Sequence, residues 1–235
     1  IHHHRHDAVR AGSLAHDQVR ALLVDRAGRL WVGGRGGLQQ WRGEQQGFVT
    51  VAGEALAGQH VTRILEDSRG RLWLGTDADG LALFDPAAGE VLRRWPPAGK
   101  GAGATADALS HYWVYGLAEG AGGEIWVATF GGGVDVIDAA SLRIVDRLRH
   151  DAGQPGTIGN DRVGAVLADR SGLMWVGSWG GGLARHDPST RAWLKLRHRA
   201  ADADGPSHPA IVRAREMADG RLWLGTNGNG VDILD

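Results

Sequence analysis

Side chains that could bind a polar ligand or move a proton gather at two places around a tryptophan that recurs five times, as Trp31, Trp73, Trp126, Trp175 and Trp223. One group lies upstream of the tryptophans, just before a short apolar run: His16, Asp17, His60, His111, Tyr112, Trp113, Asn160, Asp161, Arg162 and His208. The other group follows the tryptophans by a few residues: Arg35, Asp77, Asp79, Phe130, Trp179, Asn227 and Asn229. These residue types differ from copy to copy, as expected of one asymmetric pocket assembled from several repeats.

This mixture of aromatic, amide and charged side chains suits a carbohydrate or another polar small molecule. Stacking on apolar rings would combine with a few oriented hydrogen bonds. Arg20, Arg63 and Arg213 fall early in three of the apolar runs and add positive charge. An acidic ligand, such as a uronate or a sulfated sugar, is therefore a second expectation.

Some of these residues could instead support catalysis. His111 or His208 is a candidate general base, beside a metal held by Asp77, Asp79 or Asp161. The residues nevertheless form no specific catalytic motif. We therefore expect no catalytic residue, no bound metal and no cofactor.

Structural roles compete with functional ones for the repeated residues. The five tryptophans and the glycines near them keep a fixed register with predicted strands and turns, so we interpret them as structural. Asp25, Asp67 and Asp169 are predicted to cap their own turns through bonds from side chain to backbone, in preference to binding a metal.

The loop histidines and two extra tryptophans are weighed in the same way. His16, His111 and His208 fit ordinary hydrogen-bonded loop histidines better than catalytic ones. Trp113 and Trp179 are extra to the repeat and lie in predicted loops, so a binding role and a structural role are both open.

The tryptophans belong to one short phrase, which reads DRAGRLWVGG at 25–34 and DSRGRLWLGT at 67–76. Its copies recur at intervals of 42 to 53 residues. A period in this range is typical of solenoids, propellers and repeat arrays. A glycine stands three residues before every tryptophan, as a tight hairpin turn with positive φ requires: Gly28, Gly70, Gly123, Gly172 and Gly220.

Each repeat predicts four antiparallel strands. The first strand begins at an apolar residue upstream of the tryptophan: Val19, Val61, Val114, Val163 or Ile211. The second carries the tryptophan, the third follows a loop that ends in glycine, and the fourth is visible at 91–95, 142–148 and 193–198. This pattern predicts an all-β fold, a β-propeller of four-stranded antiparallel blades. We expect the repeated tryptophans to fill the space between neighbouring blades.

The whole chain, 1–235, is predicted to form a single propeller domain with five blades. The blades cover about 14–52, 56–96, 109–149, 158–198, and 206–235 together with 1–7. Residues 1–19 align without a gap to residues 145–163, so the chain starts like a fourth strand and stops like a third strand. We therefore expect the N-terminal strand to pair with the last blade and close the ring. The alternative is a five-blade fragment of a seven-bladed propeller.

Composition excludes several classes of partner. The formal net charge of −1 gives no field that would hold nucleic acid, and no stretch is apolar for long enough to span a bilayer. The chain has 38 glycines at fixed places in the repeat, which favours many tight turns over disorder. With no cysteine, disulfides and thiolate metal sites are absent.

The phrase D-x-x-G-x-Φ-W-Φ-G-T, preceded by Ser13, Leu14 and Val19 as S-L-x-x-x-x-V, resembles the two-component regulator propeller repeat. That family occurs in extracytoplasmic sensor regions of bacterial hybrid histidine kinases and diguanylate cyclases, mostly as seven-bladed propellers. The copies here depart from the pattern at Gly120 and Met217, which replace the leading aspartate.

The resemblance implies a periplasmic or otherwise extracytoplasmic sensor domain in a bacterium. It would bind a polar small molecule or an oligosaccharide and relay occupancy to an output kinase or cyclase domain in the parent protein. Similar propellers include streptogramin lyases and lactonases, so an enzyme of that type is one alternative. A lectin-like scaffold with several weak sites is the other.

Overall fold

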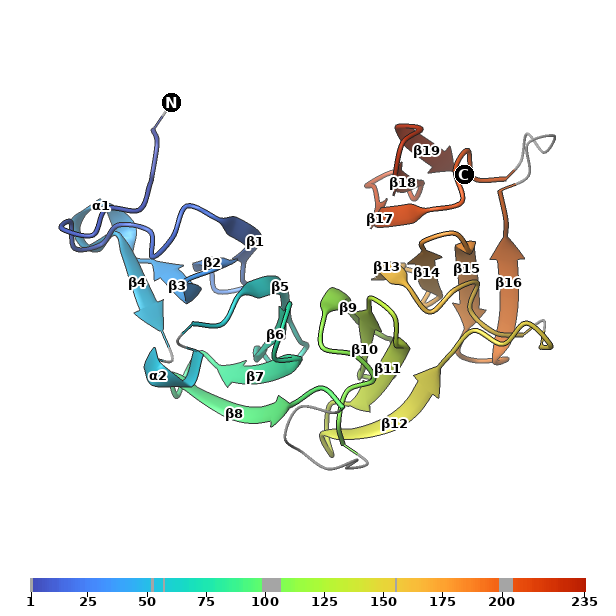
Figure 1. Ribbon diagram of the computed structural model, residues 1–235, viewed down its shortest axis with the longest axis horizontal. Helices are drawn as coiled ribbons and strands as arrows, with labels where there is room; N and C mark the ends of the chain where they lie inside the picture. The colour runs from blue at the N-terminus through green and yellow to red at the C-terminus, as the bar shows by residue number, and fades with distance from the viewer. Residues whose placement is uncertain (1, 52, 57, 99–106, 155, 199–204) are drawn as a thin grey trace. The chain divides into compact units, whose positions relative to one another are not determined.

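A computed structural model describes residues 2–51, 53–56, 58–98, 107–154, 156–198 and 205–235. These residues form five antiparallel sheets, the blades of a β-propeller, so the predicted all-β fold is confirmed (Figure 1). The chain divides into two compact units, Ile1–Ala102 with Tyr112–Val114, and Gly103–His111 with Tyr115–Asp235. Within the described residues no helix has the length and apolar character that crossing a membrane would require.

The first unit contains two blades. The strands of blade 1 are β1 (Val19–Val24), β2 (Leu30–Gly34), β3 (Gly37–Trp41) and β4 (Phe48–Val51), with the short helices α1 (Gly43–Gln46) and α2 (Gly53–Leu56) near β4. Blade 2 consists of β5 (Val61–Glu66), β6 (Leu72–Thr76), β7 (Leu81–Asp85) and β8 (Glu90–Trp95). In each sheet the strands are paired in chain order.

Three further blades follow, and they form most of the second unit. Blade 3 consists of β9 (Val114–Glu119), β10 (Glu124–Thr129), β11 (Gly133–Asp138) and β12 (Arg143–Leu148). Blade 4 consists of β13 (Val163–Ala168), β14 (Met174–Ser178), β15 (Gly182–Asp187) and β16 (Ala192–Leu196). Blade 5 has three strands in the described residues, β17 (Ile211–Glu216), β18 (Leu222–Thr226) and β19 (Val231–Leu234).

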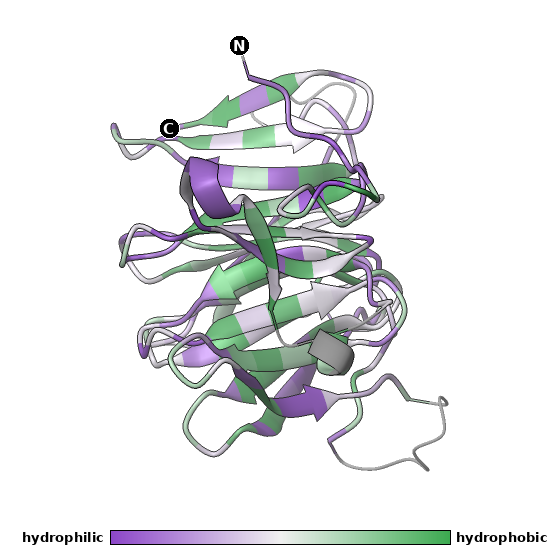
Figure 2. Ribbon diagram, turned by 90° about the vertical axis from the view of Figure 1, so that its left-hand side faces the viewer, coloured by the Kyte–Doolittle hydropathy of each residue, from purple (hydrophilic) through white to green (hydrophobic). Residues whose placement is uncertain are grey.

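The local pattern of the sequence sets these strands. Every first strand begins at the apolar residue that the repeat predicts, from Val19 to Ile211. The glycine before each tryptophan has a positive φ, for example 80° at Gly28 and 87° at Gly220, so the predicted hairpin turns are confirmed. In Figure 2 the strands carry most of the apolar, green segments.

The repeated tryptophans pack between neighbouring blades, as expected. In the first unit the Trp31 ring of blade 1 meets the Phe84 ring of blade 2 edge to face, with centroids 5.9 Å apart. In the second unit the Trp126 ring of blade 3 lies 6.4 Å from the Trp193 ring of blade 4. Trp223, in the last copy, is 38% exposed. The buried copies supply large apolar area to each blade interface.

The leading aspartates do more than cap their turns. Asp25, Asp67 and Asp169 each accept a hydrogen bond from the indole Nε1 of their own repeat's tryptophan, at 2.8, 2.9 and 2.6 Å. Each also accepts a bond from a backbone N–H in the turn, which confirms the predicted capping role. We call this arrangement the indole clamp. It fixes the turn and the tryptophan ring at once.

In blade 3 the clamp is built from a different residue. Gly120 stands where the aspartate would be, and the Glu124 carboxylate accepts the Trp126 indole bond at 3.3 Å. A Cβ atom on Gly120 would lie 2.1 Å from Glu124 Oε1. The glycine therefore leaves room for a carboxylate that arrives from another position in the repeat.

The N-terminal segment contacts blade 1. Residues 2–5 lie outside any strand. The His4 ring lies 5.0 Å from the Trp41 ring and 5.3 Å from the Phe48 ring, and the His6 N–H donates to Asp17 Oδ1 at 2.7 Å. Pairing of residues 1–7 with blade 5 stays a prediction.

Candidate functional site

The two groups of candidate loops lie side by side in the structure. The loop after the second strand is bonded to the loop that leads into the first strand of the same blade, as where the Trp179 N–H donates to the Arg162 carbonyl at 2.8 Å. It also reaches the following blade, since the N–H groups of Gly131 and Gly133 donate to the Asp161 carbonyl at 3.1 and 2.9 Å. The backbone thus brings the predicted side chains of adjacent blades together.

In the second unit this arrangement gathers four side chains from blades 3 and 4, which we call the aromatic cluster: Tyr115, Phe130, Arg162 and Trp179. The Phe130 ring stacks on Tyr115 with centroids 4.9 Å apart and meets Trp179 edge to face at 5.6 Å. The Arg162 guanidinium lies over the Phe130 ring, 5.9 Å from its centroid. The cluster offers ring faces and a cation at one place.

The indole nitrogen of Trp179 distinguishes this cluster. Trp179 Nε1 is buried and has no hydrogen-bond partner within the described residues. A Cβ atom on Gly164 would lie 3.0 Å from it, so the absence of a side chain there makes room for the indole. A buried donor without a partner costs about 1–3 kcal/mol. A buried donor of this kind needs an explanation, and a ligand that accepts its hydrogen bond is one.

The sequence reasoning missed Tyr115. It stands at the second position of β9, where the other first strands have Arg20, Thr62, Gly164 and Val212. That variation between copies is the same signal that selected the loop residues, and Tyr115 is the aromatic member of the set.

Several predicted site residues hold their own loops. His16 Nδ1 accepts the Gln18 N–H at 2.9 Å, Asn160 Oδ1 accepts the Arg162 N–H at 2.8 Å, and His208 Nδ1 accepts the Ala210 N–H at 3.0 Å. The three occupy one repeat position, three residues before a first strand. Because Nδ1 of His16 accepts a hydrogen bond, the ring proton of the neutral side chain sits on Nε2. Their structural interpretation is supported.

His111 occupies the same repeat position in blade 3, and burial lowers its pKa from the usual 6.5. Its neutral form is therefore favoured in the folded protein, so stability is full above pH 6.5 and falls as the pH drops through and below that value. We expect the loss of unfolding free energy between pH 7.5 and 5.5 to be smaller in His111→Asn. Asparagine is the residue at this repeat position in blade 4, where it is Asn160. Urea unfolding at both pH values measures this. An equal loss in the variant would contradict it.

In the first unit the structure joins His60 and Asp77. His60 Nδ1 lies 2.6 Å from Asp77 Oδ2, and both side chains are half-buried. His60 Nε2 is buried without a hydrogen-bond partner in the described part of the chain. The carboxylate orients the ring, which is how a histidine is prepared for proton transfer or for accepting a ligand hydroxyl.

Several of the remaining predicted residues bond with nearby backbone groups. Arg63 and Arg213 donate to the carbonyls of the residues before them, and Asp17 and Asp161 accept the N–H groups of His6 and His150. Asn229 Nδ2 donates to the Ser207 carbonyl at 2.8 Å. Half-buried or exposed positions hold Arg20, Arg35, Asp79, Tyr112, Trp113 and Asn227. In the described residues no three His, Asp or Glu side chains group as metal ligands.

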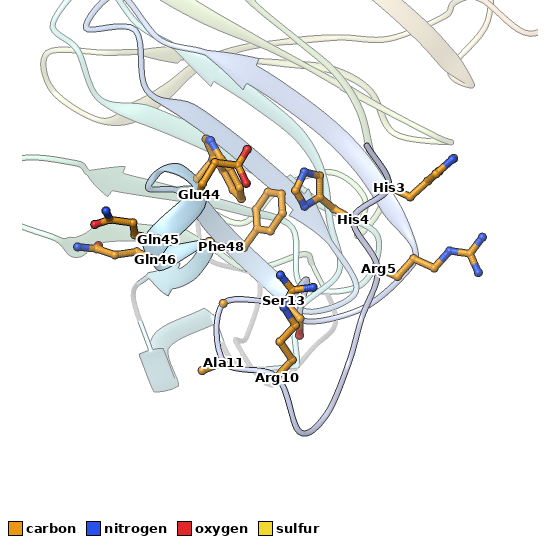
Figure 3. A pocket seen from close by; sticks show the side chains of 13 residues that line it. His3, His4, Arg5, Arg10, Ala11, Ser13, Glu44, Gln45, Gln46 and Phe48 are labelled. Atoms are coloured by element: carbon orange, nitrogen blue, oxygen red, sulfur yellow. The ribbon is translucent and has the colours of Figure 1, made fainter. Parts of the chain in front are cut away.

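A cavity of about 190 Å³ lies between the N-terminal segment and blade 1. Its lining includes His4, Phe48 and Glu44, but Figure 3 shows the side chains of His3 and Arg5 pointing away from it. The polar groups do not converge on one point, so we do not assign this cavity as the site.

Comparison with known proteins identifies the repeat. Residues 13–36 and 55–78 match the sequence family described as the two component regulator propeller. Among curated proteins no sequence is significantly similar.

Solved structures share the fold along nearly the whole chain. One is the extracellular domain of the hybrid two component system BT3049 of B. thetaiotaomicron, with 21% identity, a TM-score of 0.73, and 97% of this chain and 30% of that chain covered. Another is the extracellular domain of BT4673 of the same organism, with 22% identity, a TM-score of 0.70, and 92% and 29% covered.

An enzyme has the same fold as well. Virginiamycin B lyase of Staphylococcus aureus has 13% identity and a TM-score of 0.62, with 93% of this chain and 70% of that chain covered. The present chain spans about 30% of the length of the two B. thetaiotaomicron structures. Two of the five repeats therefore match the two component regulator propeller family, and the blades share their fold with the extracellular domains of the two B. thetaiotaomicron proteins.

Proposed function

We propose that the chain is the ligand-binding part of an extracytoplasmic bacterial sensor, without enzymatic activity of its own. The aromatic cluster binds a polar small molecule, and we favour a carbohydrate. The observation that carries this is the buried Trp179 Nε1, which has no hydrogen-bond partner among the described residues and lies next to the Phe130 ring that stacks on Tyr115. A sugar hydroxyl accepts that bond while the ring face stacks on an aromatic side chain.

The charge of the cluster decides which sugars fit best. Arg162 is exposed and its guanidinium lies over Phe130. The N–H groups of the Arg162 guanidinium can bind a carboxylate or a sulfate through two parallel hydrogen bonds. We therefore expect acidic oligosaccharides to bind more tightly than neutral ones of the same length.

Thermal-shift and calorimetric titrations against paired uronate and neutral oligosaccharides test this proposal. A ligand present at 100 times its Kd stabilises the fold by about 2.7 kcal/mol, which a thermal shift detects. We expect about one ligand per chain, and about a tenfold or greater loss of affinity in Trp179→Phe, which keeps the ring and removes the N–H. Leu194→Ala, an exposed change in the same blade, is the control. If none of the acidic or neutral oligosaccharides binds, the proposal is refuted.

The parent protein, in this proposal, places the propeller outside the cytoplasm and connects it to an output kinase or cyclase domain. The support is the match to the regulator propeller repeat and the fold shared with extracellular domains about three times longer. The five blades are then part of a larger sensor region. Ligand occupancy shifts the population of signalling states only to the extent that it binds one state more tightly.

One observation favours a second candidate, an enzyme of the lyase or lactonase type. His60 is oriented by Asp77 and has a free Nε2, the arrangement of a general base. Turnover of a lactone or a cyclic depsipeptide, lost in His60→Gln and Asp77→Asn, would establish it. Binding that persists in both variants without turnover supports the sensor.

A further inference from the structure

The second unit contains a groove outside the loops considered so far, at the interface of blades 3 and 4. Its volume is about 590 Å³, and its lining includes Glu124, Trp126, Asp146, His186, Arg191 and Trp193. We call it the interblade groove. Its lining comes from β10, β11 and β12 on one side and from β15, β16 and the turn between them on the other.

Blade 4 departs from the repeat at this groove. His186 in β15 pairs with Trp193 in β16. The same pair of positions is Phe84 with Val91 in blade 2, and Ile137 with Ile144 in blade 3. In blade 1 the pair is Trp41 with Phe48. Blade 4 differs from these three blades because the first position of the pair is a histidine, which brings ring nitrogens to a place that is apolar in the others.

The replacement carries a cost within the fold. His186 Nδ1 is buried with no hydrogen-bond partner among the described residues, whereas Phe84 and Ile137 have no polar atom to satisfy. The His186 ring instead supports Trp193, with centroids 4.5 Å apart and planes tilted by 32°, and it lies 5.6 Å from Trp126. The three rings form one platform along the groove.

Polar side chains surround this platform. Asp146 and Arg191 are exposed, Glu124 is half-buried, and Trp193 is half-buried with part of its surface in the groove. Two carboxylates and one guanidinium give the lining a net charge near −1, and burial lowers the pKa of His186 and so favours its uncharged form. The net negative charge of the lining disfavours the binding of a uronate or a sulfated sugar.

We propose that the interblade groove binds a neutral pyranose unit of an oligosaccharide. The sugar stacks on Trp193, and its hydroxyls donate to the carboxylates of Asp146 and Glu124 and accept from Arg191. This site is separate from the aromatic cluster, and it would allow the chain to hold a second part of a glycan.

The corresponding groove between blades 4 and 5 differs at the ring pair. Leu234 occupies the repeat position of His186 there. The lining still includes Trp175, Arg185, Asp169 and Asp235. This groove therefore offers an indole and charged groups but no histidine paired with a tryptophan, and it is the comparison for that pair.

The test uses the full 235-residue chain with ¹⁵N-labelled tryptophan indoles. Cellotetraose, xylotetraose, mannotetraose and diacetylchitobiose are titrated at millimolar concentrations and followed by NMR. We expect at least one sugar to shift the indole signals of Trp126 and Trp193 together. Trp193→Val, which installs the residue of blade 2, should weaken the binding reported by Trp126 about tenfold or more. Asp146→Ala should weaken it as well.

Two controls keep the proposal falsifiable. Leu194→Val and Trp179→Phe should bind the neutral sugar as the unaltered chain does. The proposal fails if no sugar shifts Trp126 and Trp193, or if Trp193→Val binds with unchanged affinity. It also fails if Trp179→Phe abolishes the shifts, which would assign the binding to the aromatic cluster. Shifts that depend on protein concentration alone would assign the groove to a second copy of the chain.

Discussion

Asp67→Ala is expected to lower the free energy of unfolding by about 3–5 kcal/mol, the usual cost of removing one partner of a buried, hydrogen-bonded charge pair. Asp67 is fully buried. Its carboxylate accepts bonds from Trp73 Nε1 at 2.9 Å, from Arg71 Nε at 2.8 Å and from two backbone N–H groups at 3.0 Å. Alanine would leave several of these donors unpaired inside blade 2.

Urea unfolding of the two proteins at neutral pH measures this change. The control is Asp219→Ala in the last copy, two residues after Met217, which stands at the position of Asp67. The Asp219 side chain is 47% exposed, and its carboxylate accepts a hydrogen bond from the Arg221 guanidinium. Its effect should stay within about 0.5 kcal/mol. If the two variants lose the same stability, the indole clamp does not stabilise the blade. Asp67→Asn, which retains an acceptor oxygen, provides a second measurement if the alanine variant fails to fold.

The same clamp predicts acid sensitivity. Burial acts to raise the pKa of Asp67, but the bonds from Arg71 and Trp73 outweigh it and hold the pKa below the usual 3.8. The stabilisation is therefore complete above pH 3.8 and is lost as the pH falls through the lower, folded value. Asp67→Asn removes this dependence, because the amide does not titrate.

The indole clamp of blade 3 can be exchanged for that of blade 1 by substituting Gly120 and Glu124. We expect the effects of these two substitutions on the free energy of unfolding to be strongly coupled. Gly120→Asp alone brings a second carboxylate against Glu124, and Glu124→Arg alone leaves the Trp126 indole without its acceptor. Each should cost roughly 1–2 kcal/mol. The double variant recreates the Asp25 and Arg29 pair of blade 1, in which Arg29 Nε donates to Asp25 at 2.6 Å. It should recover most of the loss.

A double-mutant cycle from urea unfolding gives the coupling energy directly. We expect about 1–3 kcal/mol in favour of the double variant, as for residues in direct contact. Gly220→Ala, with a φ of 87° in the turn of blade 5, is a strained substitution whose added Cβ would meet no heavy atom within 4 Å. Combined with Gly120→Asp it should be additive. An additive result for Gly120→Asp with Glu124→Arg would show that Glu124 does not replace the missing aspartate.

The sequence predicted the local structure correctly where that structure depends on residues close together in the chain. The alignment of residues 1–19 with 145–163 places His6 opposite His150, and the two loops form the same bonds: His6 Nδ1 meets the Leu14 carbonyl at 2.7 Å and His150 Nδ1 meets the Ile158 carbonyl at 2.9 Å. The same alignment predicts an outer strand for blade 5, and that pairing stays a prediction. Strand pairing depends on which edge is within reach, and aromatic contacts with Trp41 and Phe48 hold the segment on blade 1.

The periodic phrase alone determined the strands, the hairpin turns and the packing role of the tryptophans, because each depends on a few neighbouring residues with fixed φ and alternation. It also selected the loops that carry Phe130, Arg162 and Trp179. Only the tertiary structure decided which of those side chains meet, that Tyr115 joins them, that His60 pairs with Asp77, and that His186 and Trp193 open a groove. Contacts between blades depend on side-chain size and direction across residues far apart in the chain, and no local pattern encodes them.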